Sequence, residues 1–153
     1  MLYTDKNIEL HIAGEGPERP KLEAIIKDLN LEQNVHLRGY VKNVPEFLLD
    51  SDIYIHSSES EPFGIAILEA MAAGLCVIAT NVGGVPDIIT HNKNGMLFEY
   101  GNEYELKDLI SLVITDNALR INLAKNAKET VTDKFSILQT VQMYQTVYPD
   151  LVK

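Results

Sequence analysis

Short apolar runs that alternate with amphipathic helical segments are the sequence feature that most restricts the fold of this chain. Runs with strand character cover residues 8–13, 35–40, 53–56, 76–80 and 95–98. Segments with helical spacing cover residues 20–29, 44–49, 64–74, 87–90, 117–132 and 137–148. Strands that alternate with helices favour a parallel, doubly wound sheet with helices on both faces. We therefore expect an α/β fold with a Rossmann-like sheet.

Residues that begin and end helices support these boundaries. Gly74 stands where a helix that starts near Gly64 needs a left-handed C-terminal cap. Asp116 and Ser136 precede the last two helical segments, and both residue types are favourable N-caps. We expect a terminal helix within residues 133–153.

Length and charge restrict the possible partners. The chain has 153 residues, 46% of them hydrophobic and 23% charged, so we expect one domain over residues 1–153. The formal net charge of -9 argues against nucleic acid or an anionic membrane surface as the main partner, because both attract Lys and Arg. Any anion that binds must be held by local groups.

Cys76 is the single cysteine, so the chain has no disulfide framework and a reducing compartment is expected. Cys76 lies in an apolar run and is expected to be a small core residue. No run approaches the ~18 to 20 apolar residues that cross a bilayer, and the first residues lack the pattern of a signal peptide. We expect a cytoplasmic protein.

Glycine-containing loops follow the predicted strands. They cover residues 14–17, 39–41, 57–64 and 81–86. Glycine permits a positive φ and close approach of the backbone to a ligand. Ligands of parallel sheets bind at the carboxyl ends of the strands, which is where these loops lie. One such loop can be an ordinary tight turn, whereas the whole set favours a binding site at this edge.

Two glutamates flank the predicted start of a helix at Gly64. Glu61 precedes the helix, and Glu69 lies eight positions later among apolar residues, on a helix that we expect to be buried. The free N–H groups at a helix start can bind phosphate, and ionised carboxylates accept strong hydrogen bonds from sugar hydroxyls. The pattern thus fits a sugar diphosphate ligand. Taken alone, Glu69 could equally be a helix residue paired with a neighbouring backbone group or cation.

Residues 61–74 together with residues 77–87 resemble the E-x7-E region of retaining GT-B glycosyltransferases of family four, the group 1 transferases. The similarity extends from about Ile8 to about Tyr148. The resemblance implies the C-terminal, donor-binding half of a GT-B fold. It also implies transfer of a hexose from a nucleoside diphosphate sugar to a saccharide or lipid-linked acceptor with retention of configuration, as in polysaccharide biosynthesis.

The resemblance also implies roles for individual residues. Glu61 corresponds to the residue that contacts donor-sugar hydroxyls and is the candidate catalytic residue, and Glu69 corresponds to the residue that holds the ribose. The backbone N–H groups of residues 63–65 correspond to a stretch that meets donor sugar and phosphate. The matching donor-binding positions are Gly14, Gly16, Val41, Glu61, Phe63, Gly64, Ile65 and Glu69. No cofactor or metal is implied.

Compared with this family, the chain begins too late to contain the first strand-helix unit, with its Arg and Lys for the diphosphate, and the N-terminal acceptor domain. We therefore expect this piece alone to be inactive. We also expect a gap between the strands at Ile8 and Ile53, closed by Met1 to Lys6, by rearrangement, or by self-association through the open sheet. The acceptor domain would supply any peripheral association with a membrane.

Other patterns favour ordinary structure. The D-x-D at Asp50 precedes a strand, which is the wrong end of the sheet for a metal-bound donor. Residues 14–19 lack the third glycine of a dinucleotide fingerprint. The histidines show no ligand spacing along the chain. His56, at the carboxyl end of a strand, is a candidate to line the cleft.

Three functional hypotheses remain open. The first is the donor-binding portion of a retaining glycosyltransferase. The second is a GT-B relative with other chemistry, such as glycogen synthase, sucrose-phosphate synthase or a sugar-nucleotide epimerase. The third is a non-catalytic module that binds nucleotides or a partner.

Overall fold

The structure is a computed structural model that describes residues 8–148. It contains two compact units, one ending at Phe47 and the other beginning at Leu48. Each unit is described by itself. The expectation that residues 1–153 act as one domain stays a prediction.

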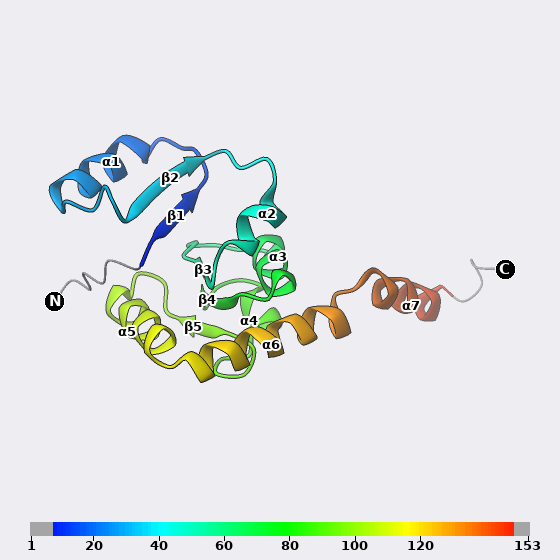
Figure 1. Ribbon diagram of the computed structural model, residues 1–153. Helices are drawn as coiled ribbons and strands as arrows, with labels where there is room; N and C mark the ends of the chain where they lie inside the picture. The colour runs from blue at the N-terminus through cyan, green and yellow to red at the C-terminus, as the bar shows by residue number, and fades with distance from the viewer. Residues whose placement is uncertain (1–7, 149–153) are drawn as a thin grey trace. The chain divides into compact units, whose positions relative to one another are not determined.

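The first unit is a two-stranded parallel sheet with one helix. β1 (Leu10–Ala13) pairs with β2 (Val35–Gly39), and α1 (Arg19–Asp28) connects them, as the blue part of Figure 1 shows. The register places His11 opposite His36. No apolar side chain among residues 8–47 is fully buried. The hydrophobic core of the described chain therefore belongs to the second unit.

The second unit is built on a three-stranded parallel sheet in the order β3-β4-β5. Its strands are β3 (Ile53–His56), β4 (Cys76–Thr80) and β5 (Met96–Phe98). The helices are α3 (Ile65–Ala73), α4 (Val85–Ile88), α5 (Glu103–Thr115), α6 (Asn117–Lys134) and α7 (Ile137–Val147), and α2 (Val44–Leu49) crosses the boundary between the units. Parallel strands flanked by helices confirm the predicted α/β class.

The core lies along β4, the central strand. All five residues of β4 are buried, so both faces of this strand are covered. On one face, side chains of β4 and β5 pack against α5 and α6, which run along this sheet in Figure 1. Members of this cluster are Cys76, Ile78, Met96, Phe98, Val113 and Leu123. Burial raises the pKa of the Cys76 thiol to about 11, which confirms it as an unreactive core residue.

The structure confirms the three predicted helix caps, but one short helix lies elsewhere than predicted. Gly74 caps α3 at φ 86°, and the side chains of Asp116 and Ser136 cap α6 and α7. The short helix predicted at residues 87–90 was misplaced: α4 covers Val85–Ile88, with Pro86 in its first turn. Proline has the φ angle of a helix and lacks an N–H that the first turn leaves unpaired anyway, so it favours this earlier start.

The described strands fall into two sheets, and β1 and β3 are not hydrogen-bonded neighbours. This break lies where the resemblance predicts an absent strand. Of the three suggested ways to close the gap, the pairing of Met1 to Lys6 lies outside the described residues. Closure by rearrangement or by another copy of the chain stays a prediction.

A buried amide secures the turn between α4 and β5. Asn94 is 5% exposed, and its Oδ1 accepts a hydrogen bond from the Thr90 N–H at 2.7 Å. Its Nδ2 donates to the Ile88 carbonyl and to the Thr130 hydroxyl, both at 3.1 Å. Because α6 carries Thr130, Asn94 ties this turn to α6.

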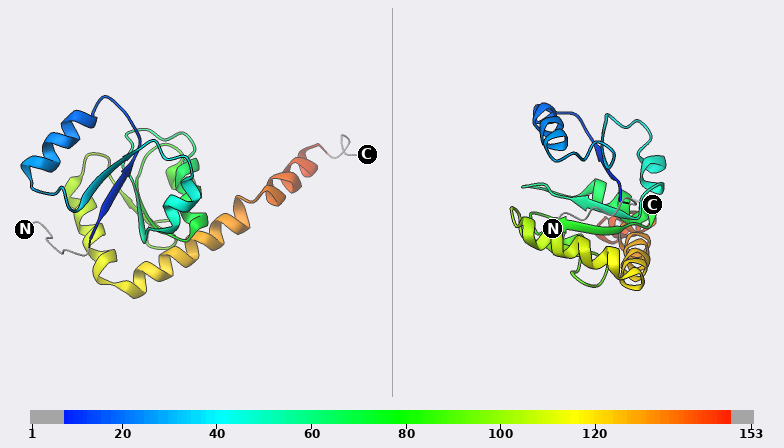
Figure 2. Two further views of the ribbon diagram at one scale, coloured as in Figure 1. Left: turned by 45° about the horizontal axis from the view of Figure 1, so that its top comes forward. Right: turned by 60° about the vertical axis from the view of Figure 1, so that its left-hand side comes forward.

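The last helix extends beyond the sheet of its unit. Figure 2 shows α7 continuing past the end of α6, away from β3, β4 and β5. Its large apolar side chains are exposed: Ile137, Leu138, Val141, Met143 and Tyr144. Among residues 8–148, no helix is both long enough and apolar enough to cross a membrane.

Candidate functional site

The loop before α3 is fastened to the glycine turn that follows β4. The Gly84 N–H donates to the Glu61 carbonyl at 2.9 Å. A Cβ at Gly83 would lie 2.2 Å from that carbonyl oxygen, and a Cβ at Gly84 would lie 2.5 Å from the carbonyl oxygen of Pro62. Glycine is therefore required at both positions for the two loops to approach each other.

The Glu61 carboxylate holds the backbone just before α3. Its Oε1 accepts hydrogen bonds from the Gly64 N–H at 2.8 Å and from the Phe63 N–H at 3.2 Å. These bonds hold the pKa of the Glu61 carboxyl below its usual range, because they stabilise the ionised form. Gly64 itself has φ 90°, a conformation that favours glycine. The carboxylate thus has a fixed position just before α3.

This arrangement changes the expectation for two backbone groups. The sequence assigns the N–H groups of residues 63–65 to the donor, but those of Phe63 and Gly64 are bonded to Glu61. A ligand that used either group would have to displace Glu61 Oε1. The N–H groups of Ile65 and Ala66 belong to the first turn, where a helix supplies no acceptor of its own. They remain able to face an anion.

His56 and Tyr54 stand beside Glu61. Nε2 of His56 lies 3.2 Å from Glu61 Oε2, with His56 only 11% exposed. At this distance the two groups can form an ion pair, but their orientation does not make a hydrogen bond. His56 Nε2 is therefore buried without a hydrogen-bond partner among the described residues. On the other ring nitrogen, the Tyr54 hydroxyl lies 3.4 Å from Nδ1. The candidate cleft position of His56 is therefore next to the predicted catalytic carboxylate.

Glu69 is exposed, which corrects the expectation of a buried carboxylate. The apolar residues of α3 that are buried are Ile67, Ala70 and Met71, so Glu69 occupies a different face of the helix. The pKa of Tyr54 is raised mainly by burial and further by Glu69 and Glu61, since two nearby negative charges oppose the phenolate. Both glutamates of the E-x7-E pattern therefore lie near enough to Tyr54 to raise its pKa.

Two large apolar side chains next to this helix start face solvent. Phe63 is 56% exposed and Ile65 is 64% exposed. Their exposure leaves apolar surface beside the carboxylates and the first turn of α3.

The remaining predicted positions lie in the first unit. Gly14 has φ 133°, and its N–H donates to the Gly39 carbonyl at 2.7 Å, which joins the loops after β1 and β2. No atom lies within 4 Å of a Cβ built at Gly14 or Gly16, so packing does not require glycine at Gly16. Val41 follows in the loop after β2. The two units thus divide the predicted site residues.

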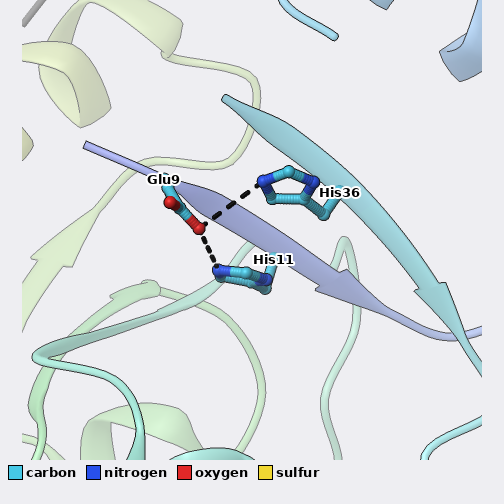
Figure 3. A group of neighbouring side chains, drawn as sticks. All are labelled: Glu9, His11 and His36. Carbon is cyan, nitrogen blue, oxygen red and sulfur yellow. Dashed lines mark hydrogen bonds and ion pairs between the residues drawn. The ribbon is translucent and has the colours of Figure 1, made fainter. Parts of the chain in front are cut away.

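A second polar group in the first unit includes residues that can bind a metal. Atoms of Glu9, His11 and His36 that could act as ligands all lie within 4.8 Å of one another, and Figure 3 shows the three side chains together. This cluster was missed because the sequence was searched for ligand spacing along one segment. Its two histidines lie on paired strands and are brought together by the register, while Glu9 lies just before β1.

Taken together, the second unit defines a class of protein. A helix start at the carboxyl edge of a parallel sheet can bind an anion, and two carboxylates beside it can accept hydrogen bonds from hydroxyl groups. These are the features of an α/β protein that binds a phosphorylated, hydroxyl-rich ligand.

The comparison with protein families is more specific. Residues 2–130 match the family "Glycosyl transferases group 1". The chain belongs to this family.

Among curated relatives, the chain is 35% identical over 152 residues to N-acetyl-alpha-D-glucosaminyl L-malate synthase of Bacillus anthracis, covering 99% of this chain and 40% of that protein. It is 30% identical over 149 residues to poly(ribitol-phosphate) alpha-N-acetylglucosaminyltransferase of Staphylococcus aureus, covering 97% and 30%. The chain thus spans less than half the length of these relatives.

Solved structures agree. The chain matches Anabaena Alr3699/HepE in complex with UDP with a TM-score of 0.85 and 28% identity, covering 93% of this chain and 41% of that one. It also matches TarM with a TM-score of 0.84 and 30% identity, covering 94% and 29%. These neighbours support the GT-B half-domain that the sequence predicts.

Sequence reasoning missed Tyr54. The available signal is its place in β3, two residues before His56 in a strand whose side chains alternate between faces, so both side chains lie on the same face.

Proposed function

We propose that this chain is the nucleotide-sugar-binding portion of a retaining glycosyltransferase, and that UDP is the nucleotide. The observation that carries the proposal is the fixed Glu61 carboxylate at the start of α3, with Glu69 acting on the same tyrosine. A structural neighbour bound to UDP-glucose supports the choice of UDP. The reaction is proposed to need no cofactor or metal.

In this proposal, Glu61 contacts hydroxyls of the donor sugar through Oε2. Oε1 is engaged by the N–H groups of Phe63 and Gly64, so Oε2, beside His56, is the oxygen available to a ligand. An ionised acceptor makes the stronger hydrogen bonds, and the lowered pKa of Glu61 keeps the carboxylate ionised near neutral pH.

Glu69 would hold the ribose of the nucleotide. Its exposed side chain is free of ion pairs within residues 8–148, and α3 holds it eight residues after Glu61. The first-turn N–H groups of Ile65 and Ala66 would meet the diphosphate between the two sugars. The roles of Gly14, Gly16 and Val41, which lie in the first unit, stay predictions.

The sugar is proposed to be N-acetylglucosamine or glucose. Curated relatives named for transfer of an N-acetylglucosaminyl group favour the first, and a neighbour solved with UDP-glucose favours the second. The acceptor would be a saccharide or lipid-linked molecule. Transfer by this chain alone is not expected.

The test is an amide NMR titration of the chain with UDP, GDP, ADP, UDP-glucose and UDP-N-acetylglucosamine. We expect shifts at Gly64 to Glu69 that are strongest for UDP and its sugars. Glu69→Gln should weaken UDP binding about 10- to 100-fold, since it removes a charged hydrogen bond of ~1.5 to 3 kcal/mol. Glu61→Gln should weaken the UDP-sugar more than UDP.

Glu59→Gln is the matched control, because Glu59 is an exposed glutamate of the loop between β3 and α3. Equal losses in Glu59→Gln and Glu69→Gln would contradict a specific ribose contact. A folded spectrum that responded to none of the nucleotides would count against the donor site and favour a non-catalytic interaction module.

A second candidate is a GT-B enzyme with other chemistry. A sucrose-phosphate synthase of Thermosynechococcus elongatus matches with a TM-score of 0.80 and 27% identity, covering 92% of this chain and 39% of that one. A clear preference for UDP-glucose over UDP-N-acetylglucosamine in the same titration would favour a glucosyl transfer of this kind.

A further inference from the structure

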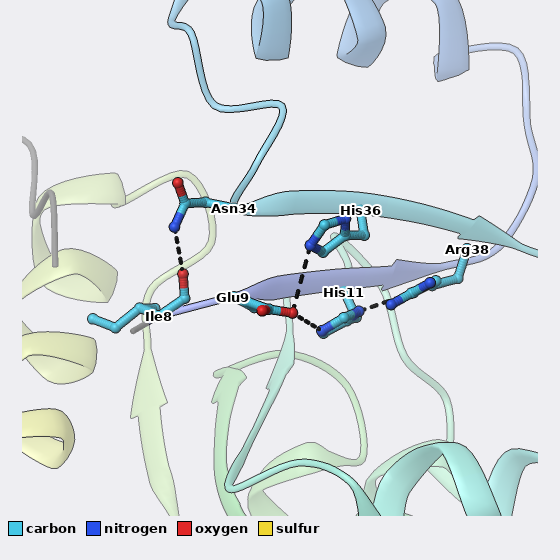
Figure 4. A network of polar contacts seen from close by, with 6 residues as sticks. All are labelled: Ile8, Glu9, His11, Asn34, His36 and Arg38. Carbon is cyan, nitrogen blue, oxygen red and sulfur yellow. Dashed lines mark hydrogen bonds and ion pairs between the residues drawn. The ribbon is translucent and has the colours of Figure 1, made fainter. Parts of the chain in front are cut away.

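We propose that Glu9, His11 and His36 form a zinc-binding site that joins β1 to β2. This site lies in the first unit and is independent of the proposed glycosyl transfer, which needs no metal. Figure 4 shows the three residues with the polar groups that surround them.

The distances between the candidate ligand atoms fit a tetrahedral ion. Oε2 of Glu9 lies 3.1 Å from Nε2 of His11 and 3.5 Å from Nε2 of His36. Zinc bonds to nitrogen and oxygen are about 2.0–2.2 Å long, so two ligands of one tetrahedral zinc lie about 3.4 Å apart. The two glutamate distances lie on either side of this value, and the remaining pair of atoms lies within 4.8 Å.

The donor set favours zinc. Two imidazole nitrogens and one carboxylate oxygen are a common protein ligand set for zinc, with water in the fourth position. The histidines are partly buried, with 26% and 30% of their side chains exposed, and the glutamate is 56% exposed. The fourth position would therefore be reached from solvent past Glu9.

The two imidazole rings are already aligned. Register places His11 opposite His36 on the same face of the sheet, and their rings stack with centroids 5.0 Å apart and an angle of 26° between the planes. The Phe47 ring lies nearly perpendicular to that of His11, with the two ring centroids 6.4 Å apart. Packing and register therefore limit the movement needed to bring both Nε2 atoms onto one ion.

Arg38 opposes metal binding. Its Nε donates to His11 Nδ1 at 2.9 Å, so in the metal-free chain the proton of a neutral His11 resides on Nε2, where it faces Glu9. Zinc requires Nε2 without its proton, and His11 must then carry the proton on Nδ1. Metal binding therefore requires the Arg38 guanidinium to leave His11.

This competition gives the proposal a distinctive test. We would titrate the chain, free of any histidine tag and previously treated with a chelator, with Zn²⁺ by calorimetry. One ion should bind per chain. Glu9→Gln, His11→Gln and His36→Gln should each weaken binding at least about tenfold, whereas Arg38→Gln should strengthen it about tenfold by removing the competing donor.

Glu32→Gln is the matched control, because Glu32 is another exposed glutamate of the first unit. It should bind Zn²⁺ like the unchanged chain. Zinc affinity that survived the combined His11→Gln and His36→Gln change would overturn the site, as would the absence of binding to the unchanged chain.

Nitrogen-15 NMR of the imidazoles separates a metal site from an effect on folding. In the unchanged chain without metal, neutral His11 should carry its proton on Nε2. Addition of Zn²⁺ should move that proton to Nδ1 and shift Nε2 of both His11 and His36. Histidine spectra that stayed unchanged while Zn²⁺ bound elsewhere would also overturn the proposal.

Discussion

At the scale of single residues, Glu61 serves two purposes. One carboxylate oxygen accepts a hydrogen bond from the Gly64 N–H just before α3, and the other lies beside His56 and is proposed to meet the donor sugar. The residue that is expected to contact the ligand is thus also the residue that fixes the helix start.

The ionisation of Glu61 should be visible in solution. Its folded pKa is lowered by the N–H groups of Gly64 and Phe63, so its contribution to stability is present above the ordinary glutamate pKa and is lost as the pH falls through the folded value. The Gly64 amide shift, followed by NMR from pH 7 downward, should titrate with a midpoint below about 4.3. Glu61→Gln should remove this transition. A midpoint at or above the ordinary glutamate pKa would contradict the hydrogen bonds from Phe63 and Gly64 to Glu61.

Gly83 should tolerate no side chain. Gly83 has φ 53°, and the Cβ of Gly83→Ala would lie 2.2 Å from the Glu61 carbonyl oxygen. We therefore expect this substitution to lower the free energy of unfolding by more than ~2 kcal/mol. Gly101→Ala is the control, because Gly101 has φ 79° with no atom within 4 Å of an added Cβ. It should cost ~1 kcal/mol from backbone strain alone. Chemical denaturation of the second unit measures the free energy of unfolding of both variants. Equal losses of stability would contradict the close approach of the Gly83 turn to the Glu61 backbone.

At the scale of the elements, one residue both ends a helix and begins the next. Asp116 is the C-cap of α5, and its side chain accepts a hydrogen bond from the Leu119 N–H at 2.9 Å as the N-cap of α6. Because both helices pack on the cluster around β4 and β5, this junction supports the core.

Asp116→Ala should lower the free energy of unfolding by ~1 kcal/mol, since it removes an N-cap. Asp108→Ala is the matched control, because Asp108 is an exposed aspartate in α5. It should leave stability within ~0.5 kcal/mol of the unchanged chain. Denaturation followed by circular dichroism would compare the two, and a larger loss for Asp108→Ala would contradict the capping role.

At the scale of the whole molecule, the two units differ in how much apolar surface they bury. Among residues 8–148, the buried apolar side chains all lie at or after Leu48, whereas the described part of the first unit is a two-stranded sheet and one helix. Two-stranded sheets without a buried core are marginally stable.

Amide hydrogen exchange should therefore separate the units. We expect the amides of His36 and Leu37 in β2 to exchange through local opening, at a low free energy. The amides of Val77 and Ile78 in β4 should exchange only at a free energy close to that of global unfolding. Equal protection of β2 and β4 would show that the chain opens as one unit. Exchange in β1 and β2 that slowed on addition of Zn²⁺ would agree with the zinc site.

The sequence by itself determined the local features of this protein. Strand and helix periods, the caps Gly74, Asp116 and Ser136, and the E-x7-E pattern can all be recognised from residues close together in the chain, because the rules that govern them act over a few residues. This is why β3, β4 and α2 match their predicted bounds and why the resemblance to the group 1 glycosyl transferases was confirmed.

Only the tertiary structure decided which distant residues meet. In the structure Glu69 is exposed, and Glu61 accepts hydrogen bonds from the Phe63 and Gly64 N–H groups. Gly83 lies close to the Glu61 backbone. The tertiary structure also placed His11 beside His36 through the register of β1 and β2. These contacts depend on strand pairing and on the approach of separate loops, and neither is determined by the residues of one segment.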